Sequence, residues 1–394
     1  MMAPVSPRTD LFLAALLTAL GFVLPFSVAA TSWVMAGLLL MALVLGRAWW
    51  QTRAWREPVM LIGLALLVFI AVRSVGQSAE GWSVALRYRE LAFAMVLLGL
   101  FRLVTLRDGF LVGLAAGCCV YAAVHWAGLF QPELAVAIQT HRISAGFAFA
   151  VTAFLMLRHA GRSASPRVWL AGAAFLAISV LFAVGGRTGY VTLFVLAACA
   201  AWMHSPKQWR WGAVMAVPVV IGLLALGSGP ARERFVESAA GSQPMADGTL
   251  SGTGIRIELV RNSAELASRY WRHGAGYGQY SRVHRELAQE RYGADPQRRH
   301  YLDQHWIASE NPHSEYVMQL VGGGAAGLAL FLAWMVAPVV RPGLSRDNRA
   351  TLGWVALAFA IGCLFNSMLM DFVEAHFYVA VLAWLLSAPP ETSS

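Results

Sequence analysis

Twelve apolar segments restrict the fold of this chain more than any other feature of its sequence. Each approaches the roughly 20 residues that a helix needs to cross a bilayer. A bilayer offers no water to exposed backbone groups, so segments of this length and apolarity must fold as helices there. The segments are 11–29, 31–46, 57–75, 88–106, 109–130, 143–159, 168–186, 188–204, 211–228, 313–340, 349–367 and 371–388. The sequence therefore predicts an all-α polytopic membrane protein with about twelve transmembrane helices.

Composition and charge agree with this fold class. The chain is 58% hydrophobic and 13% charged, whereas soluble domains carry about a quarter charged residues. If the N-terminus is cytoplasmic, the inner loops carry fourteen Lys and Arg, and the outer loops and helix ends carry five, Arg73, Arg87, Arg89, Arg142 and Arg187. This positive-inside asymmetry explains much of the net charge of +9. We therefore expect both termini in the cytoplasm, and the charge does not imply a nucleic-acid partner.

The first 30 residues and the cysteines add two expectations. Arg8, an apolar run and small residues at 27–30 imitate a signal peptide, but another apolar segment follows at once. We therefore expect an uncleaved first helix. The four cysteines (Cys118, Cys119, Cys199 and Cys363) all lie in apolar segments, so no disulfide is expected.

One long connection, residues 229–312, interrupts the short loops. Connections this long are functional or disordered unless they have structure of their own. Residues 255–271 and 281–291 show helical spacing of apolar positions, with Ser281 as a cap of the second helix and the glycine-rich HGAGYGQY between them. We expect a small folded cap on the outer face, dividing the chain into 1–228 with helices 1–9, the loop 229–312, and 313–394 with helices 10–12.

A histidine stands where this loop returns to the membrane, in the stretch SENPHSEYVMQLVGG. Asn311 is suited to cap the tenth helix and Pro312 to open it. His313 would then lie in the first turn, where the helix dipole disfavours the imidazolium and keeps a neutral base. Glu315, two residues on, faces elsewhere and is interpreted as a helix-start charge. The alternative is an interfacial histidine that only hydrogen-bonds the loop.

Arg187 lies between two apolar segments in VGGRTGY, at the outer face. An arginine near membrane depth is costly unless it is paired or faces a wet cavity, and its fork of donors suits phosphate oxygens. The alternative is a snorkelling arginine in a tight turn. His141 and Arg142 repeat the theme, more weakly, at another outer helix start.

The loop contributes further arginines, of which Arg256 in GTGIR stands out by its glycine-flanked setting. Arg261 and Arg269 are weaker candidates, because arginine also dominates the inner loops and most loop arginines should form surface ion pairs. The glycines 322–324 and 327 are expected to serve close helix packing.

Several motifs are missing from the sequence. It has no GxxxxGK[ST] loop for NTP and no DxD pair, and His300 and His305 do not have the spacing of a zinc HExxH pair. Any reaction at the outer face must then use a donor that is already activated and delivered in the membrane. A lipid-linked diphosphate is such a donor, and it requires arginines and a base but no metal or other cofactor.

Four motifs resemble the O-antigen ligase/polymerase superfamily: GGRTGY at 185–190, GTGIR at 252–256, GAGYGQY at 274–280 and HSEYVMQLVGGGAAGL at 313–328. The number of helices and the long outer loop before the tenth are also similar. Ser314 stands where the family frequently has Asn, and Tyr316 precedes Val317 where Leu is usual. The loop size most resembles the ligase branch.

The resemblance implies a reaction at the periplasmic face of the bacterial inner membrane. An O-antigen glycan would pass from undecaprenyl diphosphate to a sugar hydroxyl of lipid A–core, with inversion and without metal. By this resemblance, His313 is the general base and Arg187 and Arg256 stabilise the diphosphate. The remaining candidates for substrate binding are Arg142, His141, Arg261 and Arg269.

Two alternatives stay open. An O-antigen polymerase or an O-linked protein oligosaccharyltransferase of the same superfamily would share the donor and differ in the acceptor. A transporter of lipid-linked glycan or of an anion would use His313 and Arg187 for a proton or a charge.

Overall fold

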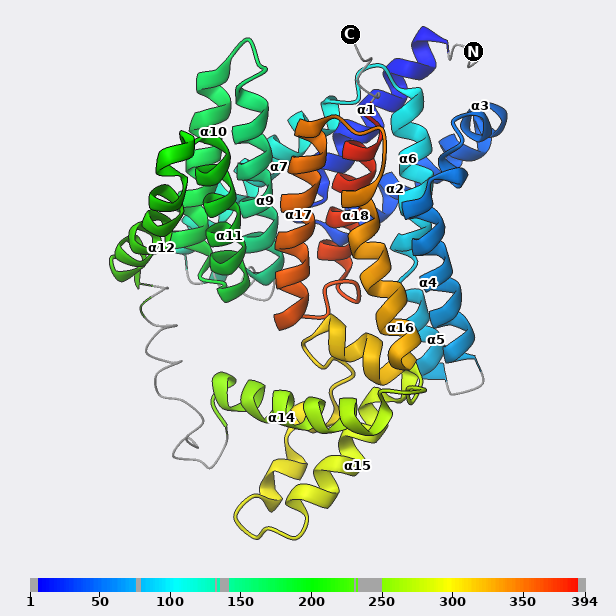
Figure 1. The fold of residues 1–394 in the computed structure, drawn as a ribbon, viewed down its shortest axis with the longest axis vertical. Coiled ribbons are helices and arrows are strands. Elements are labelled where there is room, and N and C mark those ends of the chain that lie inside the picture. Colours follow the sequence, from blue (N-terminus) through cyan, green and yellow to red (C-terminus); the bar gives the residue numbers. More distant parts are fainter. Residues whose placement is uncertain are drawn as a thin grey trace.

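The computed structural model describes residues 6–75, 79–131, 133–134, 142–229, 232 and 250–388. The regular structure of these residues is helical (Figure 1). Most helices run side by side in one bundle, and α14 and α15 form a separate layer beneath one end of it. The all-α fold class is confirmed.

The first part of the chain supplies most of the bundle. Its helices are α1 Pro7–Val23, α2 Val28–Val44, α3 Gly46–Gln51, η1 Ala54–Arg56, α4 Pro58–Ser74, α5 Ala79–Leu86, α6 Glu90–Leu103, α7 Gly109–Gly128, α9 Arg142–Ala160, α10 Pro166–Ser179, η2 Val180–Val184, α11 Arg187–His204, η3 Lys207–Trp209 and α12 Arg210–Leu226. The second part contains α14 Gly252–Tyr270, η4 Tyr277–Gln279, α15 Tyr280–Tyr292, η5 Arg299–Asp303, η6 His305–Ala308, α16 Glu315–Val340, α17 Arg346–Phe365 and α18 Phe372–Leu386.

Each of the twelve predicted apolar segments overlaps at least one of these helices. Among the described residues, five helices are long and apolar enough to cross a membrane, or six if α2 and the segment Gly46–Arg56, bent by 84°, form one span. The five are Gly109–Gly128, Arg142–Ala160, Pro166–Val184, Glu315–Val340 and Arg346–Phe365. Two shorter apolar helices are Pro58–Ser74 and Phe372–Leu386. These findings support a multi-pass helical membrane protein, and the number of twelve spans stays a prediction.

Helix α18 forms the centre of the bundle. Every residue from Val373 to Leu386 is buried, which only a helix surrounded by others achieves. Tyr378 stacks on Phe359 of α17 with ring centroids 3.9 Å apart and meets Trp334 of α16 edge-on at 5.5 Å. These ring contacts pack α18 against both α16 and α17.

Helix α16 is broken at Gly324, whose φ of 66° and ψ of −160° are not helical. Residues 271–276 of the loop fill the break. The amide of Ala275 donates to Val321 O at 2.6 Å, and the amide of Ala325 donates to Trp271 O at 2.6 Å. The loop thus satisfies backbone groups that the break frees from the helix ladder.

Glycine is required on both sides of this contact. A Cβ on Gly324 would lie 2.7 Å from Arg272 O, and one on Gly274 would lie 2.5 Å from Gly322 O. A Cβ on Gly323 would lie 2.5 Å from the Tyr277 hydroxyl. Close helix packing was predicted for Gly322–Gly324 and Gly327. Gly323 and Gly327 do approach Phe69 of α4, at 2.8 and 3.3 Å from their added Cβ atoms, whereas Gly322 and Gly324 approach the loop, and Gly324 also breaks the helix.

Helices α14 and α15 confirm the two amphipathic helices predicted in the loop. With η5 and η6 they enclose a small core of Leu250, Leu259, Ala288, Tyr292, Tyr301, Trp306 and Ile307. Ser281 is not the cap of α15, because Gln279 occupies that position and the Ser281 hydroxyl donates to Ala308 O at 3.1 Å. Residues 230–231 and 233–249 of the predicted loop lie outside the described residues, and its division from 1–228 and 313–394 stays a prediction.

Candidate active site

The segment that carries His313 differs from its prediction. Helix α16 begins at Glu315 with Ser314 at the cap position, so Asn311 is not the helix cap and His313 is not in the first turn. The Asn311 Oδ1 instead accepts a hydrogen bond from the His313 amide at 2.7 Å, which closes a local turn ahead of the helix. His313 has a φ of 53°, a conformation uncommon outside glycine. The chain therefore reverses at His313 and presents it before the helix begins.

Asn366, which follows α17, is the partner of the His313 ring. His313 Nδ1 lies 3.5 Å from Asn366 Oδ1. The other end of the amide, Nδ2, donates to Asp371 Oδ2 at 2.6 Å. Because the carboxylate accepts from Nδ2, the oxygen of Asn366 faces the histidine and calls for a proton on Nδ1. In this tautomer the free lone pair of His313 is on Nε2, so Nε2 is the ring nitrogen that can accept a proton.

The electrostatic setting of His313 favours the neutral imidazole. Burial lowers the pKa of His313 below its usual 6.5, the hydrogen bond to Asn366 raises it, and the positive charge of Arg256 lowers it further. The predicted direction is confirmed. Its main cause is burial rather than a position in the first turn of a helix.

Helix α14 carries Arg256 and also contacts the side chain of Arg187. Arg187 opens α11 after the pair Gly185–Gly186, and the φ of 66° at Gly185 lets the chain turn there. Its guanidinium donates to Thr253 Oγ1 at 3.1 Å. Arg256 lies three residues beyond Thr253, on the adjoining part of the same helix surface, and its charge reaches His313. The structure therefore brings together three residues that the sequence analysis selected.

The backbone of Arg142 lies against Gly186, the residue that precedes Arg187. Arg142 opens α9, and its carbonyl oxygen would be 2.8 Å from a Cβ placed on Gly186. His141 falls outside the described residues. The substrate-binding role of both residues stays a prediction.

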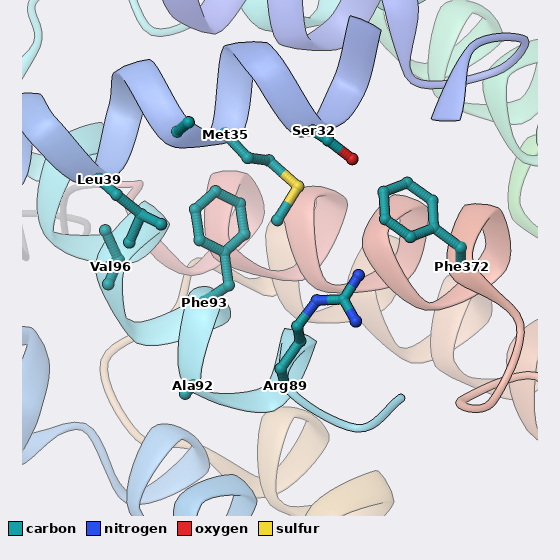
Figure 2. A pocket seen from close by; sticks show the side chains of 9 residues that line it. Ser32, Met35, Leu39, Arg89, Ala92, Phe93, Val96 and Phe372 are labelled. Carbon is teal, nitrogen blue, oxygen red and sulfur yellow. The ribbon is translucent and has the colours of Figure 1, made fainter. Parts of the chain in front are cut away.

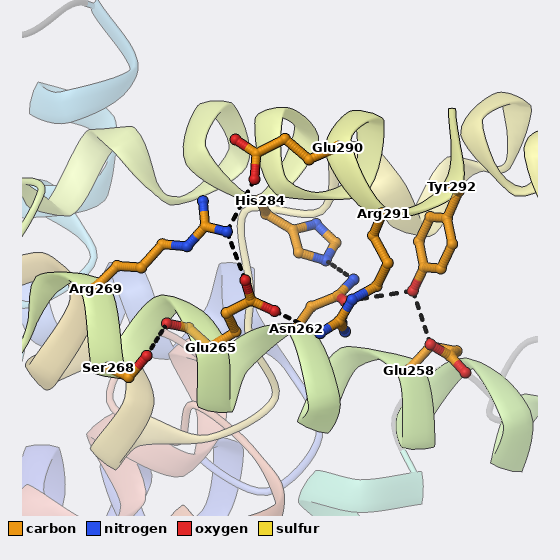
Figure 3. Close-up of polar contacts among 9 residues, drawn as sticks. All are labelled: Glu258, Asn262, Glu265, Ser268, Arg269, His284, Glu290, Arg291 and Tyr292. Carbon is orange, nitrogen blue, oxygen red and sulfur yellow. Dashed lines mark hydrogen bonds and ion pairs between the residues drawn. The ribbon is translucent and has the colours of Figure 1, made fainter. Parts of the chain in front are cut away.

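Arg261 and Arg269 form ion pairs within the loop domain, the part of the chain from α14 to η6 (residues 252–308). Arg261 pairs with Glu258 at 2.8 Å, and its side chain is 57% exposed. Arg269 pairs with Glu265 and, at 2.9 Å, with Glu290 of α15 (Figure 3). Arg269 lies thirteen residues from Arg256 along α14, or about 20 Å. The structure does not bring Arg269 to His313, and ion pairing is the role seen for both arginines.

Two carboxylates at the start of α18 belong to this region and were missed from the sequence. Asp371 receives the Asn366 hydrogen bond, and burial raises its pKa. Glu374 is buried, and its Oε1 accepts from the hydroxyl of Ser144 in α9 at 2.8 Å. The stretch DFVEAHF carried the signal, since two carboxylates and a histidine at the edge of an apolar segment are unusual.

Glu315 does not orient His313, as predicted, but it is more than a helix-start charge. It is fully buried and accepts three hydrogen bonds. The donors are Tyr88 Oη at 2.9 Å, Gln319 Nε2 at 2.8 Å and the Leu369 amide at 3.0 Å. Glu315 therefore fixes the segment between α17 and α18 that carries Asn366 and Asp371.

An apolar groove of about 380 Å³ lies between α2, α6 and the start of α18 (Figure 2). Its walls include Met35, Phe93 and Phe372, and Arg89 is its charged residue. The Arg89 guanidinium lies over the Phe372 ring, 5.6 Å from its centroid. Phe372 directly follows Asp371, so the groove adjoins the segment that supports His313.

The fold and the site define a multi-pass helical membrane protein with arginines and a histidine gathered at one end of the bundle. Residues 172–332 match the family model described as O-antigen ligase. The matched range holds Arg187, Arg256 and His313, and the resemblance seen in the sequence is confirmed there. None of the curated proteins matches the chain.

Proposed function

We propose that this protein is a glycosyltransferase of the ligase branch, acting at the periplasmic face of the bacterial inner membrane. It would move an O-antigen glycan from undecaprenyl diphosphate to a sugar hydroxyl of lipid A–core. One observation supports the proposal within the matched family. His313, oriented by Asn366, lies close enough to Arg256 of α14 for its positive charge to act on the ring, and the same helix binds the Arg187 side chain through Thr253. A neutral base beside two guanidinium groups suits attack on a diphosphate donor.

In the proposed step, the acceptor hydroxyl gives its proton to His313 Nε2 while its oxygen attacks the anomeric carbon of the donor sugar. The bond from that carbon to the diphosphate oxygen breaks, and its electron pair leaves with undecaprenyl diphosphate. A single displacement inverts the anomeric centre. General-base catalysis contributes about 10²–10⁴ in rate.

Arg187 and Arg256 would bind the diphosphate and stabilise the charge that develops on the leaving oxygen. A guanidinium matches two phosphate oxygens at once, and removing one preorganised donor from such a site costs about 10²–10³ in kcat. Arg142, whose backbone adjoins Gly186, is a further candidate for the same diphosphate.

Asn366 and Asp371 would act on His313 as positioning residues. Asn366 holds the proton on Nδ1, and the carboxylate of Asp371 holds Asn366. When His313 gains its second proton, the same pair of contacts stabilises the imidazolium.

The lipid anchors of both substrates require a site that opens toward the membrane. The groove beside Phe372 is apolar and adjoins the support of His313, so it suits a lipid chain of one substrate. Arg89 at its edge suits a phosphate.

Expression in a strain that lacks its own ligase tests the acceptor. Restoration of the lipopolysaccharide ladder supports the proposal. Glycan found on a pilin-like protein instead indicates an oligosaccharyltransferase, and longer lipid-linked glycan without a ladder indicates a polymerase. Uptake by proteoliposomes without product formation indicates a transporter.

A further inference from the structure

The end of the bundle opposite His313 contains a pocket that the proposed reaction does not use. Helix α17 runs from Arg346 at this end to Phe365 beside Asn366, twenty residues or about 30 Å away. From this pocket we infer a binding site for an anionic phospholipid of the adjoining membrane leaflet. The inference does not rest on the proposed function.

The pocket is formed where α9 and α11 end and α12 and α17 begin. Its volume is about 470 Å³. Its lining includes Arg158, Trp202, Arg210, Arg346, Asp347 and Trp354. Three arginines and one aspartate thus share one cavity, which gives it a net positive charge.

The single carboxylate does not offset this charge. Asp347 already forms ion pairs with Arg158 and with Arg162, which lies outside the pocket. Among the described residues, Arg210 and Arg346 contact no carboxylate, and the Arg210 guanidinium lies 5.5 Å from the Trp202 ring centroid. Two guanidinium groups are therefore available to an anion.

The interior of the pocket is aromatic. Trp354 lies eight residues beyond Arg346 on α17, about 12 Å deeper in the bundle. Its indole Nε1 is buried and has no hydrogen-bond partner among the described residues. A rim of guanidinium groups and a wall of indoles match a phosphate headgroup and the start of its chains better than a free anion. Basic pockets of this kind between membrane helices are suited to anionic lipid headgroups.

Native mass spectrometry of the purified full-length chain tests the inference, with titration of phosphatidylglycerol or phosphatidylcholine after removal of bound lipid. We expect retention of phosphatidylglycerol in preference to phosphatidylcholine. The double variant Arg210→Gln/Arg346→Gln should bind phosphatidylglycerol about thirtyfold more weakly, since each surface cation contributes about five- to sixfold. Arg167→Gln, at an exposed arginine near the start of α10 and outside the pocket, is the matched control and should bind normally.

Two further arms keep the test decisive. Trp354→Phe keeps an aromatic ring at this position but removes the buried N–H, so it should also weaken phosphatidylglycerol binding. It replaces the double variant as the test if that variant does not fold. Equal binding of both lipids overturns the inference, as does equal loss in the Arg167→Gln control. Full competition by inorganic phosphate also overturns it, because the site would then recognise a free anion rather than a lipid.

Discussion

His313 Nδ1 lies 3.5 Å from Asn366 Oδ1, and 53 residues separate the two along the chain. The contact joins the turn ahead of α16 to the segment after α17, and Asp371 fixes the amide from its other side. A histidine held in this way has a defined tautomer, with Nε2 free to accept a proton.

The pH dependence of transfer should report the pKa of His313. Only the neutral imidazole accepts a proton, so kcat/KM should rise with pH to a plateau, with the midpoint of the rise below pH 6.5 because burial lowers this pKa. Removing the charge of Arg256 with Arg256→Gln should move the acid limb to higher pH. Removing the Asn366 hydrogen bond with Asn366→Ala should move it to lower pH and reduce kcat.

A pH–rate series on purified enzyme checks these directions, with Arg261→Gln as the control. Arg261 pairs with Glu258 on α14 and is not among the groups that shift the pKa of His313, so Arg261→Gln should leave the acid limb unchanged. Shifts of the opposite sign, or a shift in the control alone, would contradict the assignment of His313 as the titrating base.

Arg187→Lys should be severely impaired although it keeps the charge. An ammonium is a compact donor and cannot both reach Thr253 and present two parallel N–H groups to phosphate. We expect kcat to fall about 10²–10³-fold. Thr253→Val removes only the anchor and should cost about tenfold or less. Steady-state kinetics would contradict this account if the lysine variant kept near-normal kcat.

Glu315→Ala should destabilise the protein more than any loss of a surface ion pair. It leaves the Tyr88 hydroxyl, the Gln319 amide and the Leu369 N–H without their acceptor in a buried setting. Each unsatisfied group costs about 1–3 kcal/mol, so we expect about 3 kcal/mol or more. Thermal unfolding in detergent measures this.

The matched control for this variant is Glu310→Gln. Glu310 pairs with Arg87 at 2.8 Å, and both side chains are about 40% exposed, at 41% and 39%. Exposed pairs contribute about 0–1 kcal/mol, so the melting midpoint should barely change. Equal effects in both variants would show that Glu315 does not organise the segment between α17 and α18.

Gly324→Ala should separate the loop domain from α16. The new Cβ would lie 2.7 Å from Arg272 O, and the residue would keep a φ of 66° with a ψ of −160°, a combination that only glycine adopts without strain. We expect a cost of about 1–3 kcal/mol and faster limited proteolysis between α14 and α16. Gly353→Ala is the control, since its Cβ meets only Val339 Cγ1 at 3.8 Å. Unchanged proteolysis in Gly324→Ala would contradict the role of the break.

The sequence was sufficient for features that depend on local pattern. Each apolar segment overlaps at least one helix because length and apolarity determine helix formation in a membrane. The two loop helices follow from their spacing of apolar positions, and Arg187, Arg256 and His313 were selected by residue type and place.

The sequence was insufficient where partners lie far apart along the chain. The glycines at 322–324 indicated close packing, but the break at Gly324 depends on residues 271–276, about fifty positions away. Glu315 gave no sign of its buried partner Tyr88, 227 residues distant. The Asn311 cap failed because Asn311 is equally suited to a turn, and the choice depends on where His313 meets Asn366.

The most direct test of the central claim is single-turnover transfer by purified protein carrying His313→Asn, with lipid-linked glycan and lipid A–core. Asparagine tolerates the φ of 53° at this position better than alanine, so the turn should be preserved. We predict a loss of transfer of about 10²–10⁴-fold, with unchanged thermal stability and unchanged binding of the donor lipid. Transfer near the wild-type rate by the folded variant would contradict the assignment of His313 as the base.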